Sequence, residues 1–258
     1  MPVKPSQSAV RVLKVFEQLA RIQPAGLSAL ARATGGDKSA LQRDLATLAE
    51  AGWIQPSPGD SRAWELSHQL LLLARQPPSS RALGDQLRPL LERRHKVTGE
   101  TVYLAVPHQD RFVVIQAIES PHFQRIVPPV GLIVPLKGSA TGKAFLSALD
   151  SEERARHFGG PLPDALTAEL EAIRAEGYAV SDGELIPGSI AFAAPVTDGA
   201  GRPAGTLVVT GSSDRIDRAQ WAAIGRHLAD AAGLASGALA AEIAEQFREG
   251  ARERREQA

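Results

Sequence analysis

Residues 27–54 read LSALARATGGDKSALQRDLATLAEAGWI, and this stretch decides the fold of the amino-terminal part of the chain. Its first third predicts a short helix, because apolar residues such as Leu27 and Leu30 recur at helical spacing and would share one inner face. Ser28 is a candidate amino-terminal cap for this helix. The glycine pair at 35–36 is expected to end it.

A second helix is predicted after the glycine pair, from residue 38 to about residue 50. Asp37 can cap its amino end, because a carboxylate accepts hydrogen bonds from the free backbone N–H groups there. The Ala-Gly pair at 51–52 is expected to stop the helix. Its buried face would be formed by three leucines at helical spacing, Leu41, Leu45 and Leu48.

The segments on either side of these two helices complete a small domain. Residues 8–22 form a predicted amphipathic helix, which the QPAG sequence at 23–26 ends. Two short extended pieces, at 53–55 and 63–66, flank the turn-rich PSPGD sequence at 56–60 and predict a hairpin. Three helices followed by a hairpin are typical of a winged helix-turn-helix domain.

The helix that begins at Lys38 is the predicted DNA-reading helix. In a helix-turn-helix the second helix enters the major groove, and its amino-terminal half meets the base edges. Ser39, Gln42 and Arg43 face away from the leucine stripe, and Gln and Arg side chains can make paired hydrogen bonds to adenine and guanine. The predicted phosphate and minor-groove contacts are Lys38, Ser28 and, on the hairpin, Arg62.

The distribution of charge permits this interpretation without requiring it. Residues 1–75 hold nine Lys and Arg against six Asp and Glu, a net charge of +3, and the rest of the chain holds twenty against twenty-three, a net charge of −3. A weakly basic head on a weakly acidic body permits DNA binding at one end. A polar helix face is also an ordinary solvated surface, and a module of this size can dock another protein instead.

The sequence predicts four parts. Residues 1–67 form the winged helix-turn-helix domain, residues 68–79 a linker helix, residues 80–250 a larger domain and residues 251–258 a disordered, charged tail. The PPSS sequence at 77–80 marks the boundary, because a proline pair forces extended backbone and cannot continue a helix.

The larger domain alternates predicted strands and helices. The predicted strands are 101–106, 112–118, 191–196 and 206–210, and the predicted helices are 141–149, 168–176 and 217–247. Neighbouring strands joined by short turns indicate an α/β (α+β) domain whose sheet is mainly antiparallel.

Composition and motifs exclude several kinds of chemistry. The chain has no cysteine, so disulfides and thiolate zinc sites are impossible. Its six histidines lack metal-ligand spacing, the GSATGK sequence at 138–143 lacks the spacing of a phosphate-binding loop, and no serine lies in a nucleophile-elbow pattern. No segment reaches the roughly 18 apolar residues that span a bilayer. We therefore expect a cytoplasmic protein that is not an enzyme and has no metal, cofactor or membrane partner.

Motifs along nearly the whole chain, from about residue 8 to residue 239, resemble the IclR family of bacterial transcription regulators. The motifs are LSALARATG at 27–35, KS at 38–39, LATL at 45–48, GWI at 52–54, GETV at 99–102, ESP at 119–121, GSATGKA at 138–144, EGYA at 176–179, AAPV at 193–196 and GTL at 205–207. The resemblance implies that residues 80–250 are a GAF-like effector-binding domain. It also implies a homodimer or dimer of dimers that binds double-stranded operator DNA and a small metabolite, and it adds Thr47 to the candidate DNA contacts.

The candidate effector site surrounds the start of the helix predicted at 141–149. Free N–H groups at a helix start favour an anion, here near Ser139, Ala140 and Thr141. Ordinary packing of small residues against a sheet is the alternative interpretation. The resemblance implies ligand contacts at Ala140, Thr141, Ser181, Ala191, Val208 and Thr210, with apolar walls at Phe123, Ile126 and Val134.

Family members that bind small keto acids tend to carry Asp, Cys and Ser at the positions of Ser181, Ala191 and Val208. The residues here are smaller or less polar, which suits a larger and flatter ligand. We therefore expect a small carboxylate effector, an aromatic acid, that modulates DNA binding at a catabolic gene cluster. The alternatives are an enzyme that acts on a small carboxylate through the α/β domain, and a protein-docking module.

Overall fold

The structure, a computed structural model, describes residues 4–74 and 79–256. The chain divides into two compact units, residues 1–77 and residues 78–258. None of the helices in the described residues is long and apolar enough to cross a membrane.

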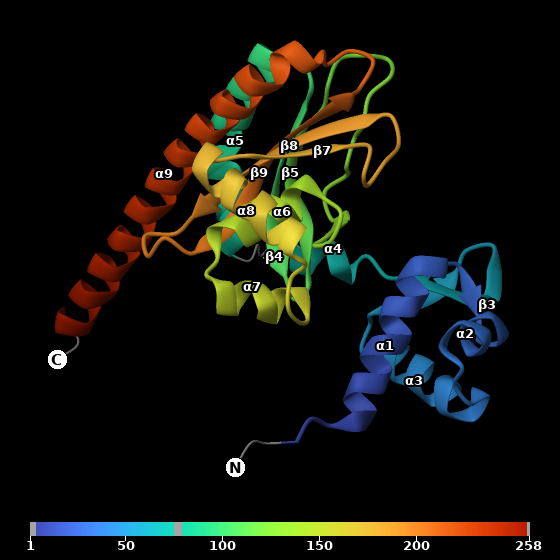
Figure 1. Cartoon of the computed structure of the whole chain (residues 1–258). Coiled ribbons are helices and arrows are strands. Elements are labelled where there is room, and N and C mark those ends of the chain that lie inside the picture. Colours follow the sequence, from blue (N-terminus) through green and yellow to red (C-terminus); the bar gives the residue numbers. More distant parts are fainter. Residues whose placement is uncertain (1–3, 75–78, 257–258) are drawn as a thin grey trace. The chain divides into compact units, whose positions relative to one another are not determined.

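The amino-terminal unit, here called the head, consists of helices and a small antiparallel sheet (Figure 1). Its helices are α1 (Gln7–Ile22), α2 (Leu27–Thr34), α3 (Lys38–Glu50) and α4 (Gln69–Ala74), and its strands are β1 (Ala25–Gly26), β2 (Ile54–Ser57) and β3 (Asp60–Leu66). The strand order is β1-β3-β2. The predicted succession of three helices and a hairpin is confirmed.

The three main helices of the head pack through the apolar stripes that their sequences predict. The buried core includes Val15, Leu19, Leu30, Leu41, Leu45, Leu48 and Ile54. Burying one such side chain contributes about 1.5–3 kcal/mol. Helices this short are marginal when isolated in water, so it is this shared core that stabilises them.

The ends of α2 and α3 follow from local chemistry. Asp37 caps α3 as predicted, and its side chain accepts a hydrogen bond from the backbone N of Ala40 at 3.0 Å. The predicted cap at Ser28 is wrong. Because β1 pairs with β3 as far as Gly26, α2 begins directly after Gly26, which occupies the N-cap position without a side-chain hydrogen bond. Ser28 therefore lies within the first turn.

The head contains a buried carboxylate that the sequence analysis did not predict. Asp44 lies on the buried side of α3 and is only 3% exposed. Both of its oxygens accept hydrogen bonds from Arg11 of α1, at 2.8 and 2.9 Å. This bidentate ion pair joins α1 to α3. Asp44 neutralises the guanidinium of Arg11, which the sequence alone would leave available to bind DNA.

The second unit is built on a six-stranded sheet with the order β6-β5-β4-β9-β8-β7. Its strands are β4 (Thr101–His108), β5 (Arg111–Ile118), β6 (Ile133–Pro135), β7 (Ala179–Asp182), β8 (Ser189–Thr197) and β9 (Pro203–Ser212). Every neighbouring pair is antiparallel. The two short edge strands, β6 and β7, were not predicted.

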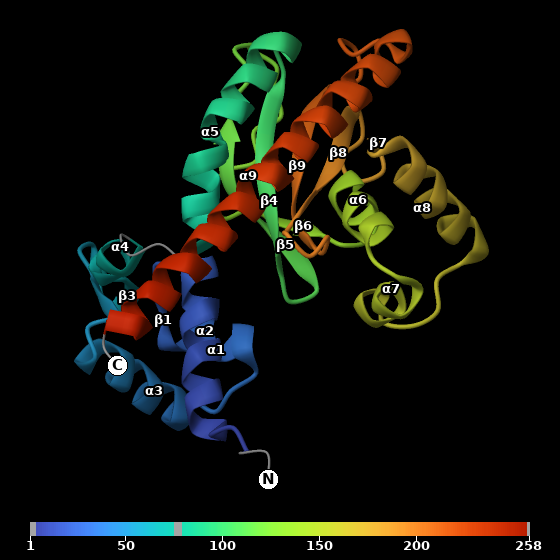
Figure 2. The same ribbon diagram turned by 90° about the vertical axis from the view of Figure 1, so that its left-hand side faces the viewer.

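Helices cover both faces of this sheet (Figure 2). Helices α5 (Ser79–Thr98) and α9 (Trp221–Glu256) lie on one face, and α6 (Ala140–Ala148), α7 (Ser151–Phe158) and α8 (Asp164–Glu176) lie on the other. A short turn of 3₁₀ helix, Arg218–Gln220, precedes α9. Strand β4 serves both cores, since Val102 and Leu104 pack on the first side while Tyr103 and Ala105 pack on the second.

Two parts of the predicted organisation differ in the structure. Helix α9 continues to Glu256, so residues 251–256 are helical where the sequence predicts a disordered tail, and residues 257–258 lie outside the described residues. The linker helix predicted at 68–79 corresponds to α4, which ends at Ala74. Residues 75–78 of that prediction also lie outside the described residues.

Candidate functional site

The exposed face of α3 holds the residues predicted to contact DNA. Along this helix Leu41, Asp44, Leu45 and Leu48 are buried. The exposed residues include all the candidates on this helix, namely Lys38, Ser39, Gln42, Arg43 and Thr47. The helix therefore separates a face that holds the fold together from a face that is free to meet a partner.

Hydrogen bonds distinguish these exposed side chains from one another. The hydroxyl of Ser39 donates to Asp37, and the hydroxyl of Thr47 donates to the carbonyl of Arg43, so both support α3 itself. Within the described part of the chain, the side chains of Gln42 and Arg43 have no hydrogen-bond partner. Their polar groups are thus free for base edges, which is what direct reading of a sequence requires.

Asp37 places a negative charge at the amino end of the same helix. The Ser39 hydroxyl and the Ala40 backbone N–H hold the pKa of this carboxyl below its usual value. The carboxylate is therefore ionised at neutral pH, and it would repel a phosphate that approaches the start of α3.

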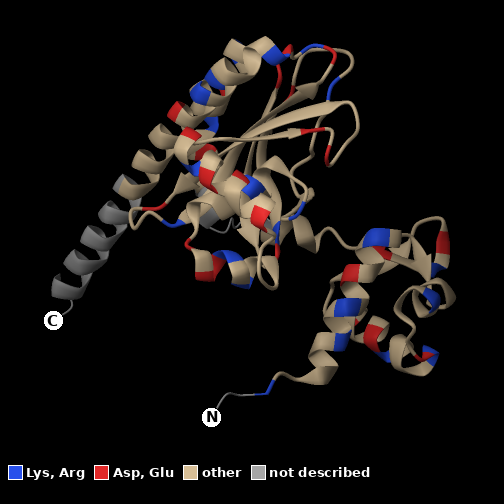
Figure 3. Ribbon diagram, in the orientation of Figure 1, with Lys and Arg blue, Asp and Glu red and all other residues tan. Residues whose placement is uncertain are grey.

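The hairpin presents the last of the predicted DNA contacts. Arg62 lies on β3 and is exposed, and its backbone N donates to the side chain of Asp60, the first residue of the same strand. Ser28, in the first turn of α2, is exposed as well. Figure 3 shows acidic and basic residues interspersed along the ribbon of the head.

The second unit contains a cavity of about 180 Å³ on the face of the sheet covered by α6. One side is the start of α6, and another is the loop before β6. The lining residues are Tyr103, Ile126, Val127, Pro128, Pro129, Leu132, Val134, Ser139, Ala140, Thr141, Ser181, Leu185, Ile186, Ser189, Ala191 and Thr210. We call this the effector cavity.

Strand register explains why distant residues meet in the effector cavity. Ser181 pairs with Ala191, and Ala191 pairs with Thr210, so the three form one row across β7, β8 and β9. Most of the predicted effector residues line the cavity, namely Ser139, Ala140, Thr141, Ser181, Ala191, Thr210, Ile126 and Val134.

Two predicted effector residues do not line the cavity. Val208 lies on the same face of β9 as Thr210 but one pleat away, where it is fully buried among core residues that include Ala193 and Tyr103. Phe123 is fully exposed to solvent, because the chain between β5 and β6 turns it outward and presents Ile126 to the cavity instead.

Tyr103 is a cavity residue that the sequence analysis missed. Its register partner is Val208, and Tyr103, not Val208, reaches the cavity. Burial raises the pKa of Tyr103, and a hydrogen bond with Thr141 offsets part of that effect. The phenol is therefore neutral and can donate or accept a hydrogen bond inside the cavity.

The start of α6 is ordered by its own side chains. The hydroxyl of Ser139 accepts from the N of Gly142 at 3.0 Å and donates to the carbonyl of Pro135 at 2.6 Å. By helix geometry the backbone N–H groups of Ala140 and Thr141 have no acceptor within the helix. These two donors, at the positive end of the helix dipole, make the cavity suitable for a carboxylate.

Lys143, a cation on this helix, is already engaged. Its Nζ lies 2.8 Å from Glu169 and 2.6 Å from Glu184. Burial works against its charge, but the two carboxylates hold the pKa of Lys143 above its usual value. The lining contains no Asp, Glu, Lys, Arg or His. Within the described residues no three His, Cys, Asp or Glu side chains gather as a metal site.

These two sites define a class of protein: a winged-helix head that exposes one helix for DNA, and an α/β domain that encloses a small cavity. Comparison with known proteins identifies the class. A model of the bacterial transcriptional regulator IclR carboxy-terminal domain matches residues 79–236, and a model of the IclR helix-turn-helix domain matches residues 8–58. The chain belongs to the IclR family of DNA-binding transcription regulators, which are not enzymes.

Curated relatives match over most of their length. The HTH-type transcriptional regulator BhcR of Paracoccus denitrificans is 30% identical over 233 residues, which cover 86% of this chain and 83% of that protein. The transcriptional repressor IclR of Escherichia coli is 27% identical over 224 residues, 81% of each chain.

Solved structures share the fold. Pseudomonas aeruginosa HmgR has a TM-score of 0.70 at 28% identity, covering 91% of this chain and 99% of that one. An IclR homolog from Microbacterium hydrocarbonoxydans, complexed with 4-hydroxybenzoate, has a TM-score of 0.74 at 19% identity, covering 90% of this chain and 100% of that one. At that identity the second likeness concerns the fold alone.

Proposed function

We propose that this IclR-family regulator binds a single-ring aromatic carboxylic acid in the effector cavity, and that the bound acid changes the affinity of the head for operator DNA. The observation that carries the proposal is a cavity that combines mostly apolar walls with a helix start. The carboxylate would accept hydrogen bonds from the N–H groups of Ala140 and Thr141, and the ring would lie against Ile126, Leu132 and Val134.

The size of the cavity favours one ring. A dry cavity of about 150 Å³ is known to bind benzene, and the effector cavity measures about 180 Å³. A keto acid of two or three carbons would leave much of the apolar wall without contacts, and each unfilled contact weakens binding. The homolog from Microbacterium hydrocarbonoxydans, which shares the fold, is complexed with 4-hydroxybenzoate, so this fold can accommodate a ligand of that class.

Polar groups on the sheet side of the effector cavity suit a ring substituent. The hydroxyls of Ser189 and Thr210 donate to backbone carbonyls. Within the described residues no group takes the hydrogen bond of the Ser181 hydroxyl, whereas Tyr103 is hydrogen-bonded to Thr141 at the helix start. A para-hydroxyl on the ring could pair with the Ser181 hydroxyl, so we expect 4-hydroxybenzoate to bind more tightly than benzoate.

Calorimetry tests the ligand class directly. Benzoate and 4-hydroxybenzoate should bind with one site per chain, and glyoxylate and pyruvate should bind much more weakly. Ala191→Phe should abolish binding, because the added ring fills the cavity. Ala200→Phe, the same change in an exposed turn, should leave binding unchanged. Tight binding of only the short keto acids would overturn the proposal.

Reading of the operator is assigned to Gln42 and Arg43 on α3, with Arg62 on the hairpin as a backbone or minor-groove contact. In gel shifts with the DNA upstream of its own gene, Arg43→Ala should weaken binding by about 1–3 kcal/mol. Arg156→Ala removes the same charge from an exposed position on α7 in the other unit and should leave DNA binding unchanged. Retention of DNA should also fall steeply with salt.

The assembly is proposed to be a homodimer or a dimer of dimers that acts in the cytoplasm as a repressor of a catabolic gene cluster. Paired heads require half-sites about one helical turn, or a multiple of it, apart. Light scattering on the purified protein and footprinting on the promoter test this. A monomeric protein that protects a single half-site would contradict it.

A further inference from the structure

A second and larger cavity lies on the opposite face of the same sheet. It measures about 580 Å³, lies between the end of α5 and the start of α9, and shares no lining residue with the effector cavity. Strand alternation separates the two: Val209 of β9 lines this cavity, while its neighbour Thr210 lines the effector cavity. We call it the α5–α9 cavity.

One half of the α5–α9 cavity is apolar. Helix α9 contributes Ala223, Ile224 and Leu228, with the polar His227 between them, at the spacing that places side chains on one face of a helix. Helix α5 contributes Val97, an exposed apolar residue. Val209 and Ile216 complete the apolar lining.

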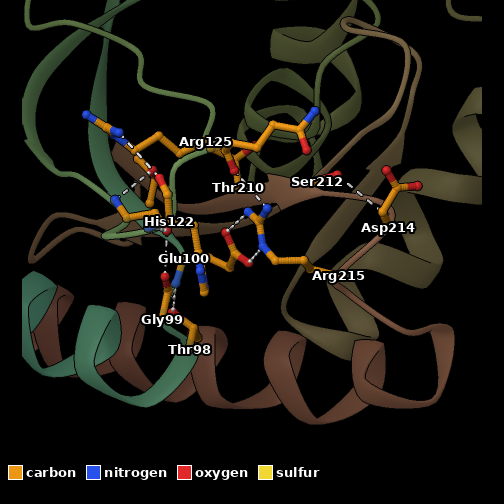
Figure 4. Close-up of polar contacts among 12 residues, drawn as sticks. Thr98, Gly99, Glu100, His122, Arg125, Thr210, Ser212, Asp214 and Arg215 are labelled. Atoms are coloured by element: carbon orange, nitrogen blue, oxygen red, sulfur yellow. Dashed lines mark hydrogen bonds and ion pairs between the residues drawn. The ribbon is translucent and has the colours of Figure 1, made fainter.

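A bidentate ion pair between Arg215 and Glu100 lines the other half of the α5–α9 cavity. Arg215 donates from Nε and Nη2 to the two oxygens of Glu100, both at 2.8 Å, and from Nη1 to the carbonyl of Gln124 at 2.7 Å. Figure 4 shows Glu100 and Arg215 facing each other, with His122 beside Glu100. A Cβ on Gly211 would lie 2.6 Å from this carboxylate, so the glycine makes room for the pair. The two charges cancel, and neither is free for a ligand.

Arg94 supplies a cation that no carboxylate among the described residues neutralises. It lies on α5 one helical turn before Thr98, and its Nη1 makes only a long hydrogen bond, 3.3 Å, to the carbonyl of His227. Its Nε is buried and has no acceptor among the described residues. A buried N–H of a charged group without an acceptor is unfavourable, so this group calls for an anionic partner or a water.

We propose that the α5–α9 cavity is a second ligand site that takes an amphipathic organic anion. The carboxylate or sulfonate of the ligand binds Arg94, and its apolar body lies along Val97, Ile224 and Leu228. A volume of about 580 Å³ falls within the usual range for small-molecule sites. The site thus admits ligands larger than the single ring that fits the effector cavity.

A fluorescence titration of the full chain with 1-anilinonaphthalene-8-sulfonate, an amphipathic anion, tests the proposal. The probe should bind at one site per chain, and decanoate should displace it. Arg94→Gln should weaken binding about tenfold, since one charge-assisted hydrogen bond is lost. Arg93→Gln, at the neighbouring exposed position of α5, should bind like the wild type.

Two further variants keep the result decisive. Val97 is largely exposed, so Val97→Glu should fold normally and should repel the probe. Ala191→Phe, which fills the effector cavity, should retain the probe. Equal binding by the wild type, Arg94→Gln and Val97→Glu overturns the proposal, because the anion then does not use this cavity. Loss of the signal in Ala191→Phe also overturns it, because the probe then occupies the effector cavity.

Discussion

Gly142 lies in the first turn of α6, where the helix passes closest to the segment before it. A Cβ here would lie 1.7 Å from the carbonyl oxygen of Leu136, and that oxygen belongs to the backbone and cannot rotate away. We expect Gly142→Ala to lower the free energy of unfolding by about 1–3 kcal/mol or more, as overpacking does. Thermal unfolding measures the change, and calorimetry should show weaker acid binding because the start of α6 moves.

The matched control for Gly142 is the same substitution at Gly233. This glycine lies in α9 and is exposed, and a Cβ added to it would meet no atom within 4 Å. Gly233→Ala should raise stability by about 0.8–1 kcal/mol, because alanine favours a helix over glycine. A lower melting temperature for Gly233→Ala than for Gly142→Ala would contradict the close approach.

Arg215 links the buried Glu100 to the loop that covers the effector cavity. Removing one partner of a buried pair leaves the other charge buried and costs about 3–5 kcal/mol, and we expect Arg215→Met to fall at or below the lower end because Arg215 is 26% exposed. The variant also releases the carbonyl of Gln124, two residues before Ile126, so acid binding should weaken. Chemical denaturation and calorimetry measure the two effects.

The control for Arg215 is Arg202→Met. Arg202 also pairs with a carboxylate, Asp198, but it is 75% exposed. A surface pair of this kind contributes about 0–1 kcal/mol. Equal losses of stability in the two variants would show that burial of Glu100 does not matter.

At the scale of the element, α3 combines a cap that supports the fold with a charge that opposes its function. Asp37→Ala should lower the melting temperature, because the start of α3 loses its acceptor. Asp37→Asn should keep the cap and increase DNA affinity, because asparagine caps as well as aspartate and a charge near the phosphates is removed. Thermal unfolding and gel shifts measure the two outcomes. Equal destabilisation by both variants would contradict the assignment.

The cap of α3 should also depend on pH. The pKa of Asp37 is lower in the folded head than its ordinary value of 3.8. Its contribution to stability is therefore complete above that value and is lost as the pH falls through the lower, folded value. The difference in melting temperature between the wild type and Asp37→Ala should narrow only below pH 3.8.

How far an element can be predicted depends on whether its end signals and its apolar stripe agree. Helix α3 was predicted from 38 to about 50 because a cap, a leucine stripe and an Ala-Gly stop all agree. Helix α7 was missed although Asp150 caps it and Gly159 ends it, because half of its sequence, SEERARHF, is charged and it has almost no apolar stripe. Strand β6 has three residues, too few for a periodic pattern, and depends on pairing with β5.

The residues of the effector cavity could be predicted at the start of α6. They could not be predicted on the sheet, where packing determines which side chains face the cavity. Ser139, Ala140 and Thr141 are recognisable as small residues at the start of a helix. Tyr103 is not, because both faces of β4 are buried and its apolar run shows no alternation that tells one face from the other. The prediction for Phe123 was wrong because the direction of a loop side chain depends on contacts that are distant in sequence.

At the scale of the whole molecule, the proposed function requires the acid to distinguish two states of the head. A ligand shifts an equilibrium only by its difference in affinity for the two states. We expect 4-hydroxybenzoate to change the operator Kd by about 5–150-fold, a coupling of about 1–3 kcal/mol. In Ala191→Phe the operator Kd without the acid should equal that of the wild type, and the response to the acid should be lost.

Thermodynamic linkage makes this coupling testable from both sides. If the acid changes the operator Kd by a given factor, the operator must change the Kd of the acid by the same factor. Calorimetric titration of 4-hydroxybenzoate into the protein, alone and saturated with operator duplex, should return the factor found by gel shift. A scrambled duplex at the same salt concentration is the control. An acid that binds equally well with and without operator, while gel shifts respond to it, would mean that the acid acts outside the equilibrium of head and cavity.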